Sequence, residues 1–298
     1  MEYNPNNFIH KACLICLSEN IHDLRGYIGK GLIRCNNCGF VFMKSIPTNE
    51  ELTSYYSSYS YSKEQYLSPI TIDSYNLLLY ELECFRKTNK ILDVGCGVGF
   101  FLQQAKKRGW DAYGTEFSNK AVEICKDKGI NIEQGVLDIS RYENESFDVI
   151  TSIEVLEHIN NPKEEIEKIC NLLRRGGLFY CTTPNFNSLS RYYLKANYYN
   201  IVYPEHLAYF TKSTLTQLAK KEGLRTVKFL STGFSISAIK ISKGKSDENP
   251  ISEESSDELL RNQISKNWHL KILKKIINKM LTLTNTGDTL KGYFEKQK

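Results

Sequence analysis

The sequence lacks any run of apolar residues long enough to span a bilayer, which takes roughly 18 residues. Residues 1–7 have neither the basic stretch nor the apolar stretch of an export signal. A strong excess of one charge is also missing, because 39 basic and 34 acidic residues leave a formal net charge of only +5. Nothing in this balance requires a polyanionic partner such as nucleic acid. We therefore expect a cytoplasmic protein.

The chain has 298 residues, enough to bury a sizeable core without disulfides, and it contains nine cysteines. Without an export signal these thiols should stay reduced, which favours metal binding or catalysis over a disulfide framework. Four of them form two C-x2-C pairs, Cys13 with Cys16 and Cys35 with Cys38. This spacing predicts a structural four-thiolate zinc site on a small ribbon at residues 1–45, and four unrelated buried cysteines are the alternative.

Residues 46–88 begin with a helix start and continue with serines and tyrosines. We interpret this segment as a helical, tyrosine-rich linker and lid, and a linker that only adheres to the surface fits the composition equally well. The tyrosines are Tyr55, Tyr56, Tyr59, Tyr61 and Tyr66.

From residue 90 onward, strand and helix patterns alternate, which predicts a parallel sheet with crossover helices. The apolar strand 90–94 leads into a glycine-rich turn and then into the helix 100–108, the context in which a ligand meets bare backbone at a helix start. Asp93 lies directly before the turn, where its carboxylate would repel a pyrophosphate and attract an ammonium or a sulfonium. S-adenosylmethionine is therefore a better ligand than a dinucleotide. The glycines of the turn are Gly95, Gly97 and Gly99.

Two further acidic residues follow the next strands. Glu116 ends the strand 111–116, about twenty residues beyond the glycines, where a carboxylate accepts hydrogen bonds from a ribose diol. Asp138 follows the strand 130–134 and is placed to reach the adenine amino group, with a helix N-cap as the alternative role.

Together these residues resemble the class I S-adenosylmethionine-dependent methyltransferases. The resemblance extends over residues 89–240 and includes the motif 93–99, the acid Glu116, the strand 146–150, and the segments 153–159, 172–178 and 183–185. The last three segments are similar to the branch that contains the ubiquinone-biosynthesis O-methyltransferases. The resemblance implies an α/β, Rossmann-like, seven-stranded methyltransferase sheet with an antiparallel last strand, and it implies S-adenosylmethionine as cofactor. Glu154 completes the expected cofactor-binding set.

The acceptor side is expected in residues 203–210, which precede the helix 212–222. Tyr203, Glu205 and His206 combine a base that works near neutral pH with a carboxylate to orient it. This segment and the four-cysteine ribbon are similar to zinc-binding sugar C-methyltransferases of deoxysugar pathways, and that resemblance makes the three residues the catalytic group. A histidine that caps the following helix is the alternative, and Glu157 with His158 are the next candidates.

The final third of the chain differs from that sugar family, which has a second sizeable domain there. We expect a helical insertion at residues 241–285 and the last strand of the sheet at 286–298. Residues 261–279 contain six basic and no acidic residues in an amphipathic pattern, whereas 247–258 contain six acidic and no basic ones. Docking of the basic helix on the core or on a second subunit is favoured over contact with a membrane surface.

The sequence thus predicts an S-adenosylmethionine-dependent C- or O-methyltransferase with structural zinc that acts on a nucleotide-linked sugar or glycan precursor. A nucleic-acid methyltransferase whose ribbon grips the polymer is the first alternative, although residues 183–185 lack the Asn/Asp-Pro-Pro-aromatic tetrad of amino-methylating enzymes. A non-catalytic zinc-ribbon adaptor is the second, and the intact acidic and glycine motifs count against it.

Overall fold

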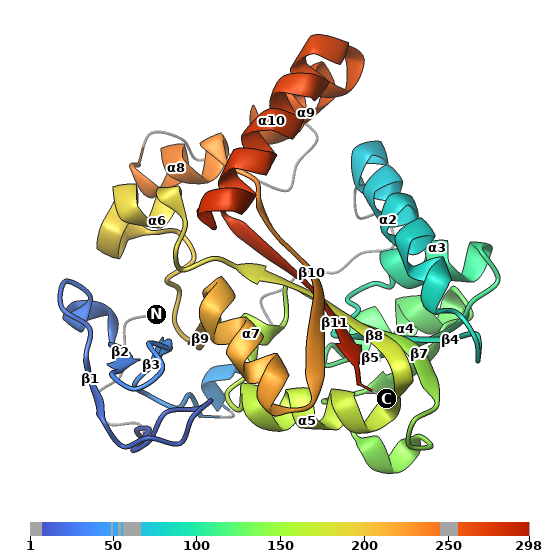
Figure 1. Ribbon diagram of the computed structural model, residues 1–298, viewed down its shortest axis with the longest axis horizontal. Helices are drawn as coiled ribbons and strands as arrows, with labels where there is room; N and C mark the ends of the chain where they lie inside the picture. Colours follow the sequence, from blue (N-terminus) through green and yellow to red (C-terminus); the bar gives the residue numbers. More distant parts are fainter. Residues whose placement is uncertain (1–7, 49, 53–54, 56–66, 245–255, 298) are drawn as a thin grey trace.

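The computed structural model describes residues 8–48, 50–52, 55, 67–244 and 256–297 (Figure 1). Its centre is a seven-stranded sheet with the strand order β10-β11-β8-β7-β4-β5-β6. Strands β4 to β8 run parallel to one another, whereas β11 is antiparallel to both of its neighbours. The α/β methyltransferase fold with an antiparallel last strand is therefore confirmed. The strands are β4 (Lys90–Val94), β5 (Asp111–Glu116), β6 (Asn131–Gln134), β7 (Phe147–Ile153), β8 (Leu173–Pro184), β10 (Leu224–Thr232) and β11 (Thr289–Lys296).

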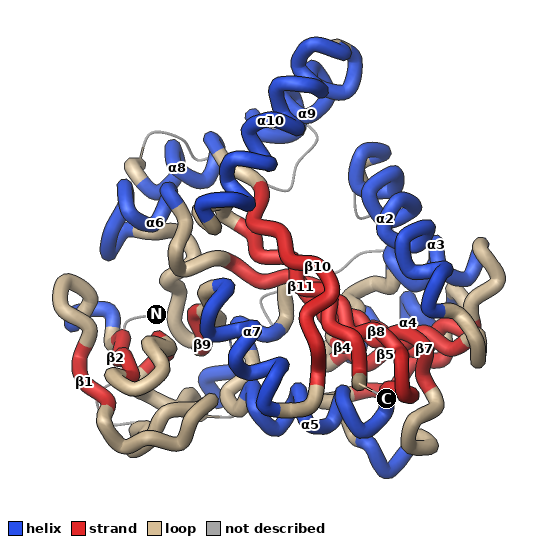
Figure 2. Tube along the Cα trace, viewed as in Figure 1, coloured by secondary structure: helices blue, strands red, loops and turns tan. Residues whose placement is uncertain are grey.

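Helices cover both faces of this sheet (Figures 1 and 2). The side chains of successive strand residues point to opposite faces, so a strand buried on both sides is apolar at consecutive positions. In β4, Leu92 packs into the cluster that includes α5 and α7, whereas Ile91 packs into the cluster that includes α2 and α3. The helices are α2 (Pro69–Leu82), α3 (Phe100–Lys107), α4 (Asn119–Asp127), α5 (Pro162–Leu172), α6 (Leu189–Leu194) and α7 (Lys212–Lys221). Short 3-10 helices lie at Ile28–Lys30, Glu83–Phe85, Ile139–Arg141, Leu156–His158 and Lys195–Asn197.

The N-terminal residues form a second, four-stranded antiparallel sheet with the order β1-β2-β3-β9. Strands β1 (Ile21–Asp23), β2 (Leu32–Cys35) and β3 (Val41–Met43) come from the ribbon, but β9 (Ala208–Tyr209) comes from the segment between β8 and α7. Side chains of the ribbon, among them Phe40 before β3 and Phe42 within it, share a buried cluster with the central sheet. The ribbon is therefore packed on the core and shares a sheet with it.

The parallel strands end at a common edge, which we call the carboxyl edge. In the register of the last strands, Thr289 of β11 lies opposite both Pro184 at the end of β8 and Thr232 at the end of β10. Ligands of open α/β sheets bind outside the carboxyl ends of the strands. The loops that leave this edge are therefore where the site is to be found.

Between β10 and β11 the chain forms α8 (Ile236–Ser242), α9 (Ser256–Lys266) and α10 (Trp268–Thr284). Helix α10 projects away from the sheet at the top of Figure 1, and Leu281 is its one buried residue. The basic segment 261–279 is divided between α9 and α10, and the two parts contact the core differently. Arg261 of α9 donates a hydrogen bond to Thr71 of α2 at 3.1 Å, whereas α10 contacts the core in its C-terminal half, at Asn278 and Leu281. In the part of the chain that the structure describes, no helix has the length and apolar character needed to cross a membrane.

Candidate functional site

The glycine turn after β4 adopts a backbone that only glycine tolerates well. Gly95, Gly97 and Gly99 have φ angles of +67°, +55° and +75°. A Cβ atom on Gly95 would lie 2.7 Å from Cγ2 of Val155, whereas one on Gly97 would meet nothing within 4 Å. The turn therefore packs against the loop after β7 on one side, and at Gly97 it leaves room for a ligand to approach the backbone.

Glu116 is tied to the same turn. Its side chain is 8 % exposed. One carboxylate oxygen accepts a hydrogen bond from the Gly97 N–H at 2.9 Å, and the other accepts from the Ser118 N–H at 2.9 Å. Each oxygen keeps a second lone pair. The carboxylate is thus held rigidly beside the glycines and can still accept hydrogen bonds from a diol.

Asp93 is buried under the turn, with 3 % of its surface exposed. Its carboxyl accepts a hydrogen bond of 2.6 Å from Oγ1 of Thr151. Burial raises the pKa of Asp93 to about 7, the hydroxyl of Thr151 lowers it, and the neighbouring charge of Glu116 raises it further. Among the described residues Asp93 has no ion-pair partner. A ligand with a positive charge would supply one.

Sequence reasoning missed two exposed apolar side chains next to these acids. Phe117 follows Glu116 and is 55 % exposed, and Val136 is 72 % exposed. The two lie close together because the Gly135 N–H donates to the Glu116 carbonyl. The sequence signal for this apolar rim was the position of the two apolar residues just after neighbouring strands. Such a rim suits a flat aromatic ring.

Asp138, by contrast, is engaged with its own helix. One carboxylate oxygen accepts hydrogen bonds from the Ser140 N–H and hydroxyl at 3.0 and 2.7 Å, and the other lies 3.4 Å from Nε of Arg141. The residue is the N-cap of Ile139–Arg141. This is the alternative role that the sequence left open.

The acceptor-side residues meet at a pair of histidine rings. The ring centroids of His158 and His206 are 4.8 Å apart in an edge-to-face arrangement. Nδ1 of His158 lies 2.8 Å from the backbone carbonyl of Glu205, and Nδ1 of His206 lies 2.8 Å from that of Asn200. A carbonyl only accepts, so each Nδ1 carries the proton. Nε2 is therefore the unprotonated nitrogen of both rings, and in His158 it lies 3.8 Å from Oε1 of Glu157.

The surroundings keep both rings neutral. Burial lowers the pKa of His158 to about 4, helped by repulsion from His206 and opposed by Glu205. Burial also lowers the pKa of His206, while Glu205 and the Asn200 carbonyl raise it. Two imidazoles that are neutral at physiological pH can accept a proton or bind a metal ion.

A tyrosine of the linker contacts Glu205. The hydroxyl of Tyr55 donates to a carboxylate oxygen of Glu205 at 2.5 Å. Tyr203 is 6 % exposed within an apolar cluster, and its hydroxyl donates to Glu51 at 3.2 Å. The linker thus supplies a residue to the acceptor side. The rest of the tyrosine-rich stretch, 56–66, lies outside the described residues.

Two carboxyl groups on the loop after β7, those of Glu154 and Glu157, lie between the glycine turn and the histidine pair. Glu157 is buried and accepts a hydrogen bond of 2.9 Å from Oγ1 of Thr183, and burial raises its pKa well above the usual range. Glu154 has a φ of +56° and is accessible to solvent, yet desolvation by the surrounding protein raises its pKa. Because Glu154 is both accessible and surrounded by protein, we infer that it lies in a concave part of the surface. The ligand atoms of Glu157, His158 and His206 all lie within 4.8 Å of one another, a spacing that suits a metal ion.

The four cysteines of the ribbon converge as expected. Their sulfur atoms lie within 4.8 Å of one another, with 3.5 Å between Cys13 and Cys38 and 3.5 Å between Cys16 and Cys35. Thiolates about 2.3 Å from a tetrahedral zinc ion are about 3.8 Å apart. The donor set, its spacing and the absence of disulfides among the described residues all fit zinc.

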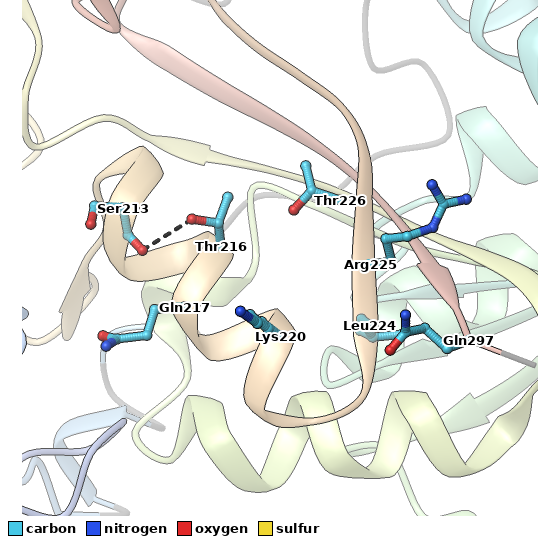
Figure 3. A pocket seen from close by; sticks show the side chains of 8 residues that line it. All are labelled: Ser213, Thr216, Gln217, Lys220, Leu224, Arg225, Thr226 and Gln297. Atoms are coloured by element: carbon cyan, nitrogen blue, oxygen red, sulfur yellow. Dashed lines mark hydrogen bonds between the residues drawn. The ribbon is translucent and has the colours of Figure 1, made fainter.

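Two open surface hollows lie away from these residues. The cavity in Figure 3, about 440 Å³, is lined by α7 and the start of β10, including Lys220 and Arg225. Leu224 of β10 pairs with Lys296, so this cavity is at the opposite edge of the sheet from the carboxyl ends. The other, about 490 Å³, is an apolar groove between α6 and α8. Neither cavity is lined by the acids and histidines described above. The candidate site is therefore defined by those residues and not by a cavity.

Comparison with known proteins connects these features to a family. A family profile described as "Methyltransferase domain" matches residues 71–228, more than half of the chain. The ubiquinone biosynthesis O-methyltransferase of Coxiella burnetii (strain RSA 493 / Nine Mile phase I) is 28 % identical over 172 residues, 52 % of this chain and 71 % of that protein. The protein of the same name from Nitrosomonas europaea is 28 % identical over 147 residues, 45 % of this chain and 63 % of that protein.

Solved structures show the same fold at low sequence identity. A SAM-dependent methyltransferase from Archaeoglobus fulgidus has a TM-score of 0.50 and 18 % identity, and the match covers 82 % of this chain and 99 % of that one. Phosphoethanolamine N-methyltransferase 2 of Haemonchus contortus, solved with S-adenosyl-L-methionine, has a TM-score of 0.53 and 16 % identity, covering 87 % of this chain and 62 % of that one.

Proposed function

We propose that this chain, which belongs to the methyltransferase-domain family and is a class I S-adenosylmethionine-dependent methyltransferase, methylates a nucleotide-linked sugar or glycan precursor. The main support for the proposed acceptor site is the pair of neutral histidines beside Glu205. An acceptor hydroxyl, or a carbon next to a keto group, must lose a proton before or during methyl transfer. The Nε2 lone pair of His206 is where that proton would go.

The residues at the glycine turn suit S-adenosylmethionine. In this proposal Glu116 accepts hydrogen bonds from the ribose hydroxyls, Phe117 and Val136 flank the adenine, and buried Asp93 faces the positive end of the molecule. Glu154 lines the same cleft beside Val155, the residue that packs on Gly95. Asp138 is proposed to lie near the adenine while it caps its helix. When bound, the cofactor supplies an electrophilic methyl group.

His206 is proposed as the base and His158 as the ring that packs against it. The Asn200 carbonyl fixes the Nδ1 proton of His206, so the ring accepts the acceptor's proton at Nε2. Glu205 raises the pKa of both histidines and is oriented by Tyr55. Tyr203 would support this group from its apolar cluster by holding Glu51.

A structural zinc ion in the ribbon would stabilise the acceptor side. The ligands proposed are Cys13, Cys16, Cys35 and Cys38. Residue pairs Val41 with Tyr209 and Phe42 with Ala208 join the ribbon to the strand directly after Glu205 and His206. A small ribbon of this kind depends on its metal for folding, so the metal would also hold the acceptor loop.

The charge state of Asp93 makes cofactor binding depend on pH. Its pKa is raised to about 7, so the carboxyl is mostly neutral at pH 6 and loses its attraction for a cationic ligand. We expect S-adenosylmethionine to bind roughly fivefold to tenfold more weakly at pH 6 than at pH 7.5, measured by calorimetry. Asp93→Asn should bind weakly at both pH values, whereas the exposed control Asp111→Asn should behave like the wild type. Equal affinity at both pH values in the wild type would contradict this role of Asp93.

Removal of the proposed base should separate catalysis from cofactor binding. His206→Ala is expected to lower kcat by about 10²-fold or more, the usual contribution of a positioned base, with cofactor affinity within about twofold of wild type. His22→Ala, an exposed histidine on β1, is the matched control and should keep full activity. Turnover and calorimetry should be measured on the same preparations. Full turnover of His206→Ala would show that the acceptor is activated elsewhere, with His158 next in line.

Measurement of the metal content tests whether the ribbon binds zinc. Protein purified without chelator should contain one zinc ion per chain, and Cys35→Ser should lose it together with methyl transfer while cofactor affinity changes by no more than about twofold. Cys84→Ser, which removes an exposed cysteine of the 3-10 helix Glu83–Phe85, should retain both zinc and activity. A zinc-free wild type would exclude the site, and a fully active Cys35→Ser variant would exclude its link to the acceptor loop.

Acceptor identity is tested by incubating the enzyme with S-adenosylmethionine and two acceptor classes and measuring the mass gain of one methyl group. Nucleotide-linked keto-sugars are expected to be methylated. A hydroxyl-bearing precursor of ubiquinone is the second candidate, because the relatives that are 28 % identical are named ubiquinone biosynthesis O-methyltransferases. Methylation of the ubiquinone precursor alone would replace the sugar proposal, and methylation of nucleic acid alone would overturn both.

A further inference from the structure

Three helices at the carboxyl edge form one surface of the molecule. Helix α6 packs on α8, and the middle of α10 is tied to the chain that leads into α8, because the Gly233 N–H donates to Oδ1 of Asn278 at 3.1 Å. Figure 1 shows the three helices together at the end of the molecule away from α5. We call α6, α8, the residue Phe234 between β10 and α8, and α10 the three-helix surface.

This surface is unusually apolar for a region that no other part of the described chain covers. On α10, large apolar side chains are between 44 % and 74 % exposed, and the pattern repeats at helical spacing. Isolated exposed apolar residues are ordinary, but a contiguous set of this size marks an interaction site. The exposed members on α10 are Trp268, Ile272, Leu273, Ile276, Ile277, Met280 and Leu283.

The apolar character continues from α10 onto the other two helices. The groove of about 490 Å³ between α6 and α8 is lined almost wholly by apolar atoms, with Leu189 and Tyr193 on one wall and Ile236 and Ile239 on the other. Phe234, which is 51 % exposed, lies at the same groove. The exposed apolar area is therefore wider than one helix face.

The three helices of this surface carry charge of a single sign, although an acid of the neighbouring helix α9, Asp257, accepts hydrogen bonds from Ser235 and Ile236 at the start of α8. Helices α6, α8 and α10 contain no aspartate or glutamate, whereas α10 alone contains four lysines. Lys271, Lys275 and Lys279 are exposed, and none is in an ion pair with any residue that the structure describes. A second copy of the chain would bring like charges together, which opposes self-association through this surface. An anionic partner with an apolar interior matches both properties.

We propose that the three-helix surface docks the protein on an anionic lipid bilayer, with α10 lying in the interface. In that arrangement the apolar side chains of α10 enter the acyl boundary while Lys271, Lys275 and Lys279 meet the headgroup phosphates. Trp268, at the first turn, suits the headgroup region. Because α8 to α10 leave the sheet at its carboxyl edge, the site opens on the side of the molecule that carries this surface. This docking is independent of the proposed acceptor.

The test is sedimentation of the full chain with lipid vesicles. The wild type should pellet with vesicles of equal parts phosphatidylglycerol and phosphatidylcholine, stay in the supernatant with phosphatidylcholine alone, and be released by high salt. Lys275→Gln/Lys279→Gln should weaken binding about 30-fold, the effect of two lysines at an anionic surface. Lys107→Gln/Lys126→Gln removes the same charge from α3 and α4 and should change affinity by less than about twofold.

A second variant tests whether the apolar side chains of α10 contribute to vesicle binding. Ile272→Ser/Ile276→Ser should weaken binding more than about tenfold, because both side chains would enter the bilayer. Its S-adenosylmethionine affinity, measured by calorimetry, should equal that of the wild type, which shows that the variant is folded. A wild type that does not bind anionic vesicles would overturn the proposal. So would a wild-type dimer that becomes monomeric in the isoleucine variant, since α10 would then be an interface between copies.

Discussion

The pairing of β3 with β9 is the constraint on which the acceptor side depends. Only two residue pairs form it, but it is extended by the hydrogen bond from the Met43 N–H to the Leu207 carbonyl at 2.8 Å. Leu207 in turn donates its own N–H to the Glu157 carbonyl at 2.7 Å. One continuous set of backbone hydrogen bonds thus runs from the cysteine ribbon through the acceptor loop to the loop after β7. The ribbon therefore determines where His206 lies relative to His158.

Desolvation, more than pairing of charges, sets the electrostatics of the cleft. It raises the pKa of Asp93, Glu154 and Glu157, and it lowers the pKa of both histidines. Each of these groups is therefore biased toward its neutral form in the free protein. A cation near Asp93 would gain more from a poorly hydrated carboxylate than from a surface one, and a neutral imidazole is ready to take a proton. Both properties come from the same burial.

The central fold could be predicted because strand and helix patterns are local. The strand 90–94, the glycine turn and the strand 111–116 appear in the structure with those bounds, since apolar runs and glycines determine them within a few residues. Contacts across the chain could not be predicted in this way. Tyr55 reaches Glu205 over 150 positions, and β9 is too short to have a sequence signature of its own. The composition of α10 indicated a basic amphipathic helix, but its exposure depends on how few elements pack against it. The assigned roles of the site residues remain predictions.

The two additions to the sheet are attached beside the proposed acceptor side, and the helical one also reaches α2. Arg261 of α9 donates a hydrogen bond to Oγ1 of Thr71, and burial together with the nearby charge of Asp93 raises the pKa of Tyr75 on the same helix to about 12. The ribbon joins through β9, between β8 and α7, and the helices α8 to α10 lie between β10 and β11. Strands β4, β5 and β6, whose ends hold Asp93, Glu116 and the apolar rim, are at the other end of the strand order. Because β8, β10 and β11 are adjacent, both additions extend from the same half of the carboxyl edge. In the roles proposed above, the cofactor and the acceptor would therefore be bound at different halves of the carboxyl edge.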